Sequence, residues 1–406
     1  MKPCSSPPPA LPPPGSAEES PVLDRCPSVP PDRPQAAYVH VPFCRHRCGY
    51  CNFTLVAGRD DLIEPYLRAL ARELTWLGEP QPVRTLFVGG GTPTHLPPDA
   101  LARLLMLLKC WLPLLPGGEW SIEANPVDLD PPRLDALHRA GITRISLGVQ
   151  SLAPHKLAAL ERDHDADCVA QAVAAARQVA QSVSLDLIFG VPGETLADWQ
   201  QDLQAALALA PDHLSTYGLT WEKGTRFWAR RLRGQLAPLE EETERAMYEH
   251  AIDRLTAAGF EHYEVSNFAR PGHRCRHNEV YWKREPFFGV GPGAARLIGG
   301  RREVNHRSTT TYLRRVLAGQ SPVQEAEHLG PEDAAREQLV LGLRRMEGVD
   351  LAAFHEATGF SVAQLGGQAL ERMLQQGLLE LAAGRLRLTR QGLLISDSLW
   401  PAFLRV

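Results

Sequence analysis

The sequence lacks the features of a disulfide-built, membrane-spanning or nucleic-acid-coating protein. Its 406 residues include eight cysteines, a density too low for a scaffold that depends on disulfides. It has no run of about 18 apolar residues, so no apolar membrane-spanning helix is expected. The formal net charge is -4, whereas proteins that mainly hold a nucleic-acid backbone are usually basic. With 44% hydrophobic and 22% charged residues, the composition is that of an ordinary globular protein.

Residues 1–35 differ in composition from the rest of the chain. Twelve of them are proline, with serine, alanine and glycine between. Such a segment cannot build a core, so we expect a disordered tail that is partly polyproline II. The tail also lacks the continuous apolar stretch of a secretion signal. Together with clustered cysteines further along, this predicts a reducing compartment, the cytoplasm.

Residues 36–265 alternate between short apolar runs and stretches with helical periodicity. The apolar runs are 38–43, 85–88, 120–123, 144–149, 184–189 and 214–219, and the expected helices lie near 60–77, 98–112, 131–140, 166–181 and 195–210. Repeated strand–helix units predict a parallel sheet. Their number and length predict an α/β fold, a partial (β/α)6-type barrel. A long helix to about Ala258 and a seventh short strand at 260–265 are expected to follow.

The remainder divides into two parts. Residues 266–330 contain many glycine, proline and arginine residues and are expected to be an irregular linker region. In residues 331–406 the pattern predicts helices near 332–345, 350–357 and 361–376, a hairpin around Ala383 and Gly384, and a last helix. This order resembles a winged-helix module. Its hairpin region is only slightly positive, so we expect it to pack against the barrel or cover a substrate rather than bind DNA.

Unusual residues follow the expected strands one after another. They occupy 44–51, 89–93, 123–126, 148–151, 186–195 and the neighbourhood of Tyr217. In β/α barrels the functional groups lie at the carboxyl ends of the strands. A single segment of this kind is weak evidence, but six at the same end predict one site.

The strongest signal within these segments is a cysteine triplet. Cys44, Cys48 and Cys51 are separated by three and then two residues, which places three thiolates on one tight loop. Three thiolates can hold three irons of a 4Fe–4S cluster and leave the fourth iron open to a small molecule. The alternative is a structural zinc site, which needs four protein ligands and could take the fourth from His46 or His40.

A glycine run and several polar residues complete the pattern. Gly89–Gly91 followed by Thr92 predicts close backbone approach and exposed N–H groups, although such a run is also typical of an ordinary tight turn. It matches neither a P-loop nor a dinucleotide fingerprint. Asp186 lies inside an apolar run, where an unpaired charge is costly, and this raises its functional weight.

Together these motifs resemble a known family. Cx3Cx2C after the first strand, then GGGTP, EANP, GVQS and DLIFGVPGET, resembles the radical S-adenosylmethionine (SAM) superfamily. The resemblance covers residues 37 to about 400. It is to the branch that holds the oxygen-independent coproporphyrinogen III oxidases and the HemW heme chaperones.

The resemblance implies specific roles. The three cysteines would ligate the cluster, SAM would chelate the open iron, and an electron donor would reduce the cluster so that SAM is cleaved to a 5′-deoxyadenosyl radical. The positions that match SAM-contacting residues are Tyr38, Tyr50, Gly90, Gly91, Thr92, Glu123, Gln150, Arg162 and Asp186. Of these, glycine amides and the Thr92 hydroxyl would suit the amino-acid end of SAM.

Two features separate the members of this branch. The oxidases carry a fourth cysteine two residues after the third, where this sequence has Phe53. HemW-like members carry HNxxYW, which is present here from His277 to Trp282. The resemblance therefore implies binding of heme and its transfer to apoproteins, with His277 as an axial ligand. His273 and Cys275 are alternative ligands, and by itself the motif could be a core histidine with two packing aromatics. The alternative function is coproporphyrinogen III decarboxylation, an oxidoreductase (dehydrogenase) activity.

Overall fold

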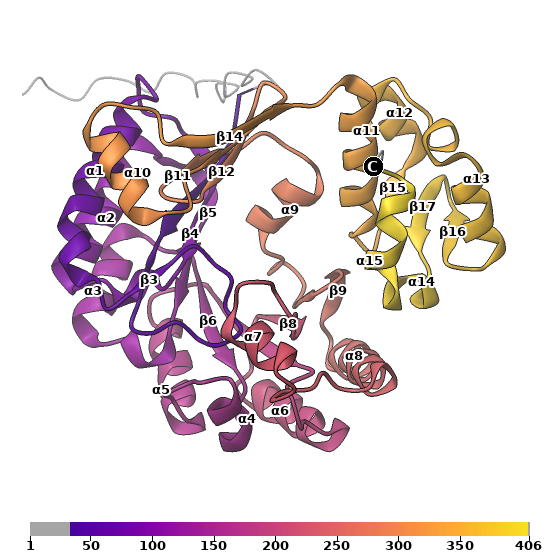
Figure 1. Ribbon diagram of the computed structural model, residues 1–406, viewed down its shortest axis with the longest axis horizontal. Helices are drawn as coiled ribbons and strands as arrows, with labels where there is room; N and C mark the ends of the chain where they lie inside the picture. The colour runs from indigo at the N-terminus through magenta and orange to yellow at the C-terminus, as the bar shows by residue number, and fades with distance from the viewer. Residues whose placement is uncertain (1–32, 405–406) are drawn as a thin grey trace, which may run out of the picture. The chain divides into compact units, whose positions relative to one another are not determined.

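The computed structural model describes residues 33–404 (Figure 1). The expected disordered tail, with Cys4 and Cys26, lies almost entirely outside these residues. From Pro34 onward the described residues belong to one compact unit, so the barrel and the C-terminal part belong together. No helix among residues 33–404 is both long and apolar enough to cross a membrane.

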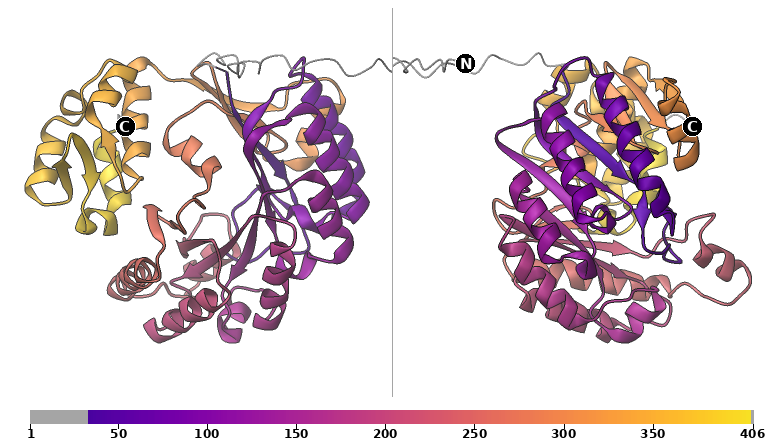
Figure 2. Two further views of the ribbon diagram at one scale, coloured as in Figure 1. Left: turned by 180° about the vertical axis from the view of Figure 1, so that it is seen from behind. Right: turned by 90° about the vertical axis from the view of Figure 1, so that its left-hand side faces the viewer.

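A nine-stranded sheet forms the barrel wall, in the order β11-β1-β4-β5-β6-β7-β8-β10-β9. Its six central strands confirm the six expected β/α units and pair in parallel: β1 (Ala36–Val41), β4 (Val83–Gly90), β5 (Leu114–Ala124), β6 (Arg144–Gln150), β7 (Ser182–Phe189) and β8 (His213–Gly218). The outer helices are α1 (Ile63–Thr75), α2 (Pro98–Trp111), α3 (Pro131–Ala140), α5 (Ala166–Arg177), α6 (Leu196–Ala208) and α8 (Glu241–Ala257). These helices cover the outer face of the wall (Figures 1 and 2).

Local sequence explains where these helices begin and end. Thr195 and Asp198 form a capping box at the start of α6, and Asp165 caps α5. Gly141 ends α3 at φ 86°, a backbone conformation that favours glycine. One face of α5 is buried against the sheet, as its apolar periodicity predicts. Helix caps and apolar faces therefore act together to fix the β/α units.

The region expected to be irregular is mostly regular structure. It contains β10 (Asn267–Ala269), α9 (Arg276–Trp282), β11 (Phe288–Val290), β12 (Ala295–Ile298), β13 (Arg301–Asn305), α10 (Thr309–Leu317) and β14 (Val323–His328). The seventh expected strand is β9 (Glu261–Glu264), which pairs with β10, and β10 runs antiparallel to β8. β11 extends the sheet on its other side by pairing in parallel with β1. Strands of three to five residues are too short to give a clear period-two signal.

The C-terminal part has a separate core and a winged-helix-like order. It consists of α11 (Pro331–Leu343), β15 (Val349–Asp350), α12 (Leu351–Thr358), α13 (Val362–Gln375), β16 (Leu379–Ala382), β17 (Arg385–Leu388), α14 (Arg390–Leu394) and α15 (Ser396–Leu399). The expected hairpin turns at Ala383 and Gly384, which both have positive φ, as a two-residue hairpin turn requires. The backbone of this part joins the barrel where Arg344 O accepts from Val265 N.

Four short elements surround the carboxyl ends of the strands. β2 (Phe43–Cys44) and β3 (Val56–Ala57) pair in parallel and close the loop that carries the cysteine triplet. α4 (Pro154–Ala159) follows β6, and α7 (Arg226–Leu232) follows β8. The periodicity of the sequence did not predict α4 or α7, because each spans fewer than two helical turns.

Candidate functional site

A cavity of about 410 Å³ lies at the carboxyl ends of the parallel strands. Most of the site residues expected from the sequence line it: Cys44, Cys48, Tyr50, Cys51, Gly90, Gly91, Thr92, Glu123, Gln150, Arg162 and Asp186. Tyr38 and His277 do not line it. The other lining residues include Asn125, Ser146 and Tyr217. One end of the sheet thus gathers the motifs, as the β/α pattern predicts.

The cysteine loop is held in shape by an arginine. Arg47 donates to the carbonyl oxygens of Cys51, Phe53 and Leu55, at 3.2, 3.3 and 2.7 Å. The loop therefore wraps around a guanidinium while its thiols face the cavity. Cys44 Sγ lies 3.2 Å from Thr92 Oγ1. In this way the loop after β1 and the loop after β4 meet at the Cys44 sulfur.

Two thiols of the triplet need a bound cation to become thiolates, and this fits a cationic iron cluster. Burial raises the pKa of Cys44 to about 12 and raises the pKa of Cys51 as well. A bound metal centre would supply the positive charge that turns such thiols into thiolates. Within residues 33–404, no three His, Cys, Asp or Glu side chains are gathered closely enough to hold a single metal ion.

The suggested fourth zinc ligands have other partners. Both ring nitrogens of His40 are occupied, because Nδ1 lies 3.0 Å from Tyr38 Oη and Nε2 lies 2.6 Å from Thr54 O. His46 Nε2 lies 2.7 Å from Glu161 O and also 3.5 Å from Cys48 Sγ, so it stays beside a thiol of the triplet. His40 therefore serves the fold here rather than completing a metal site.

The glycine run works differently from the expectation. Gly90 N donates to Glu123 Oε2, Gly91 N donates to Val41 O and Thr92 N donates to Phe43 O, so these amides are not free for a ligand. The glycines are needed for close packing, since a Cβ on Gly90 would lie 2.3 Å from the His40 ring. Gly90 also has φ 108°, which other residues rarely adopt. Exposed N–H groups were therefore a wrong prediction, and close backbone approach was a correct one.

Two buried carboxylates face the cavity from β5 and β7, the strands on either side of β6. Burial raises the pKa of Glu123 to about 7, and that of Asp186 to about 6. Asp186 accepts from Ser146 Oγ, which lies 3.0 Å from Oδ2. Sequence reasoning did not single out Ser146, although parallel pairing of β6 with β7 puts it beside Asp186. Such carboxylates suit ammonium or hydroxyl donors of a ligand.

Strain and an unpaired donor mark the end of β6. Gln150 has φ 66°, an unfavourable conformation for a residue with a Cβ. Beside it, Arg162 donates to Gly148 O at 2.6 Å and to Asn125 Oδ1 at 3.2 Å. Its Nε is buried without a hydrogen-bond partner. A buried unpaired donor at a cavity wall is typical of a site that a ligand completes.

The loops around the cavity rest on a buried ion network. Lys156 Nζ lies 2.5 Å from Glu194 Oε1 and 2.6 Å from Asp202 Oδ2, and all three side chains are almost fully buried. Asp202 also accepts from Ser151 Oγ at 2.7 Å. The network ties the loops after β6 and β7 to α6. Glu194, which the sequence pattern places in one of the site loops, thus stabilises the loops around the cavity through its ion pair with Lys156.

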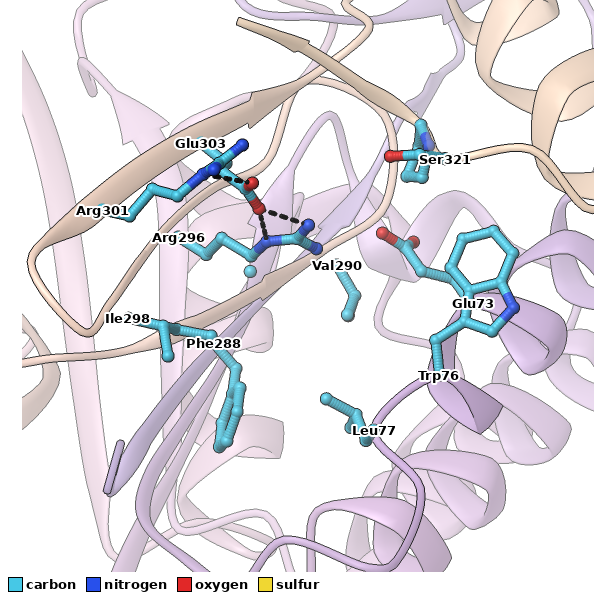
Figure 3. Close-up of a pocket in the computed structure, with 12 residues that line it drawn as sticks. Glu73, Trp76, Leu77, Phe288, Val290, Arg296, Ile298, Arg301, Glu303 and Ser321 are labelled. Atoms are coloured by element: carbon cyan, nitrogen blue, oxygen red, sulfur yellow. Dashed lines mark hydrogen bonds and ion pairs between the residues drawn. The ribbon is translucent and has the colours of Figure 1, made fainter. Parts of the chain in front are cut away.

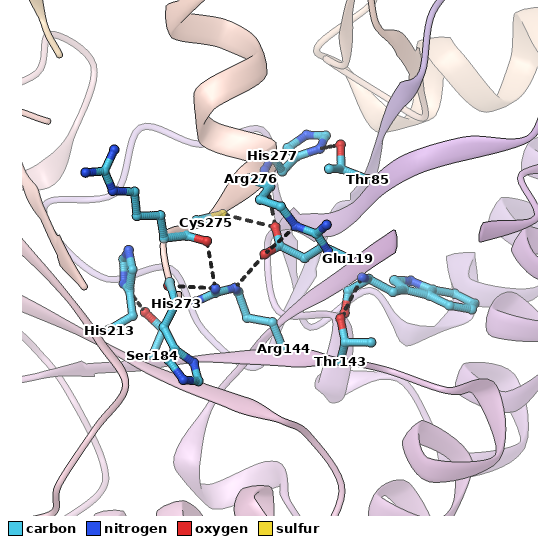
Figure 4. Close-up of polar contacts among 12 residues, drawn as sticks. Thr85, Glu119, Thr143, Arg144, Ser184, His213, His273, Cys275, Arg276 and His277 are labelled. Carbon is cyan, nitrogen blue, oxygen red and sulfur yellow. Dashed lines mark hydrogen bonds and ion pairs between the residues drawn. The ribbon is translucent and has the colours of Figure 1, made fainter. Parts of the chain in front are cut away.

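His277 lies at the opposite, amino-terminal end of the barrel interior (Figure 4). It is 1% exposed, with its Nδ1 3.0 Å from Thr85 Oγ1 and its Nε2 2.9 Å from Tyr281 Oη. Its ring also stacks on Phe87, with 5.3 Å between ring centroids. Burial lowers the pKa of His277 to about 3, so the imidazole is neutral. In this arrangement neither ring nitrogen is open to a heme iron.

An ion pair holds the segment that leads into α9 (Figure 4). Glu119 lies 3.3 Å from Arg144 and accepts from the backbone N–H of His277. Arg144 in turn donates to the carbonyl oxygens of His273 and Arg274. The pair therefore fastens both sides of the turn before α9 to the start of the sheet.

The two alternative heme ligands, His273 and Cys275, lie beside this ion pair. Cys275 is 3% exposed and its Sγ lies 3.7 Å from Glu119 Oε1. Burial raises the pKa of this thiol to about 12. His273 is half-buried. Cys275 is thus as enclosed as His277, and of the three only His273 is partly open to solvent.

A second cavity, of about 360 Å³, lies outside the barrel wall (Figure 3). Phe288, Val290 and Leu77 form its apolar side, and Glu303 bridges Arg296 and Arg301 at its rim. None of the residues expected from the sequence to form a site lines it. Its one deeply buried acid, Glu73, already accepts from Tyr312 Oη at 2.6 Å.

The fold and the cavity define a radical SAM protein. Residues 38–206 match the Radical SAM superfamily model, and residues 329–395 match the HemN C-terminal domain model. The crystal structure of coproporphyrinogen III oxidase (HemN) from Escherichia coli has the same fold, with a TM-score of 0.81 over 93% of this chain and 91% of that chain, at 24% identity.

Comparison with curated proteins narrows the family. The heme chaperone HemW of Bacillus subtilis is 35% identical over 376 residues, which cover 91% of this chain and 99% of that protein. The HemW of Mycobacterium tuberculosis is 39% identical over 378 residues, 91% of this chain and 94% of that protein. The mouse protein named radical S-adenosyl methionine domain-containing protein 1, mitochondrial, is 35% identical over 90% of this chain and 86% of its own length. The chain belongs to the HemW family.

Proposed function

We propose that this protein is a heme chaperone that binds heme and passes it to apoproteins, and that its barrel carries a 4Fe–4S cluster and SAM. The observation that carries the proposal is the family membership over nearly the full length of a curated HemW. Phe53 supports it, because this exposed side chain occupies the position where the resemblance implies a fourth cysteine in the oxidases. We further propose the cytoplasm as the compartment, since the cavity thiols need reducing conditions.

Cys44, Cys48 and Cys51 would hold the cluster in the 410 Å³ cavity. When bound, the reduced cluster supplies the electron that cleaves SAM to methionine and a 5′-deoxyadenosyl radical. Glu123 and Asp186 would accept from the donor groups of SAM, and Tyr50 would enclose it. Because the glycine amides are used within the fold, Gly90 and Gly91 would contribute their close backbone approach rather than N–H donors.

Heme would bind where α9 now packs into the barrel. His277 is the proposed axial ligand, with Tyr281 and Trp282 against the porphyrin face. Since both of its ring nitrogens are hydrogen-bonded, α9 must move away from Thr85 before the imidazole can reach iron. Trp282 already contacts the C-terminal part, where the Arg344 guanidinium lies 4.6 Å from its ring centroid. Movement of α9 would therefore change both the contact of His277 with the barrel and the contact of Trp282 with the C-terminal part.

The test is hemin titration of the anaerobically reconstituted protein with His277→Ala. We expect loss of the Soret band shift and of heme transfer to an apoprotein, while a His273→Ala control keeps both. Unchanged affinity and transfer in His277→Ala would remove this histidine from the heme site. The matched fold of HemN makes decarboxylation the second candidate. Protoporphyrinogen formed from coproporphyrinogen III with SAM and reductant would establish it.

A further inference from the structure

The helix α7 packs directly on the cysteine loop. Phe227 N donates to Gly49 O at 2.9 Å, and Gly49 lies between Cys48 and Cys51 in sequence. A Cβ on Gly49 would lie 2.4 Å from the Phe227 ring, so the contact admits no side chain there. The guanidinium of Arg226 also donates to Arg47 O. The cysteine loop therefore lies directly against the inner side of α7, and the outer side of this helix is left for a partner.

The outer side of α7 is strongly positive in a chain that is negative overall. Residues 226–233 include four arginines and no acidic residue, whereas the whole chain has a net charge of -4. Arg226 pairs with Glu161. For Arg230, Arg231 and Arg233, no carboxylate within residues 33–404 comes close enough to form an ion pair. An acidic partner would find these charges available.

Aromatic and apolar side chains accompany the arginines. The Arg231 guanidinium lies 5.3 Å from the Trp221 ring centroid and 5.7 Å from that of Trp228, so these rings hold it in place. Leu232 at the end of α7 is 71% exposed, and Phe53 on the cysteine loop is 60% exposed. Exposed apolar residues beside held arginines are typical of a surface that a protein covers.

We propose that this surface, formed by α7 and the cysteine loop, docks a small acidic protein that carries one electron at a time. The proposal rests on the cluster of the proposed function but not on heme binding. Cleavage of SAM consumes one electron, which the chain has to receive from outside. In the docked complex the reduced centre of the carrier loses one electron and the cluster gains it, with no bond made or broken. Docking on α7 brings that centre close to the loop of Cys48.

The experiment compares two double variants of the reconstituted holoprotein. Arg230→Glu with Arg233→Glu reverses charge on α7 and spares Arg231, which packs on the tryptophans. Arg254→Glu with Arg314→Glu makes the same charge change on exposed residues of α8 and α10. Anaerobic stopped-flow follows bleaching of the cluster absorbance near 400 nm with two reduced acidic carriers, one with a flavin and one with a 2Fe–2S centre. Dithionite serves as the small reductant.

At low salt we expect the α7 variant to be reduced about tenfold more slowly than wild type by at least one carrier. Its reduction by dithionite and the control variant should be unchanged, and added salt should remove the difference. Equal rates with both carriers would overturn the proposal. So would normal cluster reduction combined with slowed heme transfer, which would assign the surface to the heme recipient. Loss of heme binding with the carrier effect intact would instead defeat only the chaperone function.

Discussion

The two ends of the barrel interior are built in opposite ways. At the carboxyl ends, the cavity has a strained Gln150, an unpaired Arg162 Nε and two carboxylates with raised pKa values. At the amino-terminal ends, His277 is stacked and hydrogen-bonded at both ring nitrogens. The first end is arranged for a ligand that is not part of the chain. The amino-terminal end is packed like an ordinary protein core, with no polar group of His277 left open.

This difference shows how a static fold reveals one kind of site and conceals another. A permanently held cofactor needs a preformed cavity with polar groups left open. A cargo that is picked up and passed on can instead use a site present only in an open form of the protein, whose closed form resembles ordinary packing. The following experiments test whether the two ends differ in this way.

The largest effect should come from the cysteine loop. Replacing Cys48 with Ser removes one of the three proposed cluster ligands, and we expect nearly complete loss of bound iron and of absorbance near 400 nm after reconstitution. Cys275→Ser is the matched control, because this cysteine is buried at the other end of the barrel. Full iron content in Cys48→Ser would mean that the triplet does not bind the cluster.

The close packing around Gly90, at the carboxyl end, should tolerate a substitution almost as poorly. Gly90→Ala puts a Cβ against the His40 ring at φ 108°, so we expect a loss of about 2–4 kcal/mol in the free energy of unfolding. Gly117→Ala has φ 70° but nothing within 4 Å, and should cost only about 1–2 kcal/mol. Urea denaturation of both variants measures the gap. Equal losses would show that packing at His40 contributes little.

Lowering the pH should favour the opening of α9 at the amino-terminal end of the barrel. The pKa of His277 is about 3 when packed, against about 6.5 for a free imidazole. The opened form therefore binds more protons below pH 6.5, and opening of α9 should rise up to about tenfold per pH unit as pH falls from 6.5 toward 3. Hydrogen exchange of the α9 amides in heme-free protein measures this, with His277→Gln as the control that lacks the dependence. A pH-independent difference between the two would contradict the closed-site picture.

The smallest effect concerns a single hydrogen bond. Thr85→Val removes one partner of His277 in the packed state, worth about 1 kcal/mol. If heme binds only after α9 opens, the apparent hemin affinity should rise about fivefold. Thr143→Val, whose hydroxyl bonds to the backbone of Trp120 and not to His277, should leave it unchanged. Weaker hemin binding in Thr85→Val would show that His277 ligates iron where it now lies.

Most of the barrel and its cavity could be predicted from the sequence. Apolar runs of four to six residues separated by amphipathic helices predict parallel strands, and the loops that follow such strands must meet at one edge. This is why Cys44, Glu123 and Asp186 could be grouped before their contacts were known. Asp186 is the plainest case, since a charge inside an apolar run has to be satisfied by something.

The remainder depends on contacts between distant residues. β11 spans three residues, and only its pairing with β1 makes it a strand. The amides of Gly90 and Gly91 were expected to face a ligand, but partners on β5 and β1 take them. Sequence places His277 in a motif and does not show that Thr85, 192 positions away, closes it. α7 is too short to show helical periodicity, so the sequence pattern does not predict that its arginines lie on one helix.

The place of β11 beside β1 also bears on synthesis at the ribosome. The first strand is made early, yet its outer neighbour does not exist until residue 290 has been added. The turn after β11 then brings Gly293 against Thr54 of the cysteine loop. Until β11 has been made, the edge of β1 that leads into the cysteine loop has no partner strand. Completion of β11 pairs this edge, so residues near position 290 complete the surroundings of cysteines that lie near position 50.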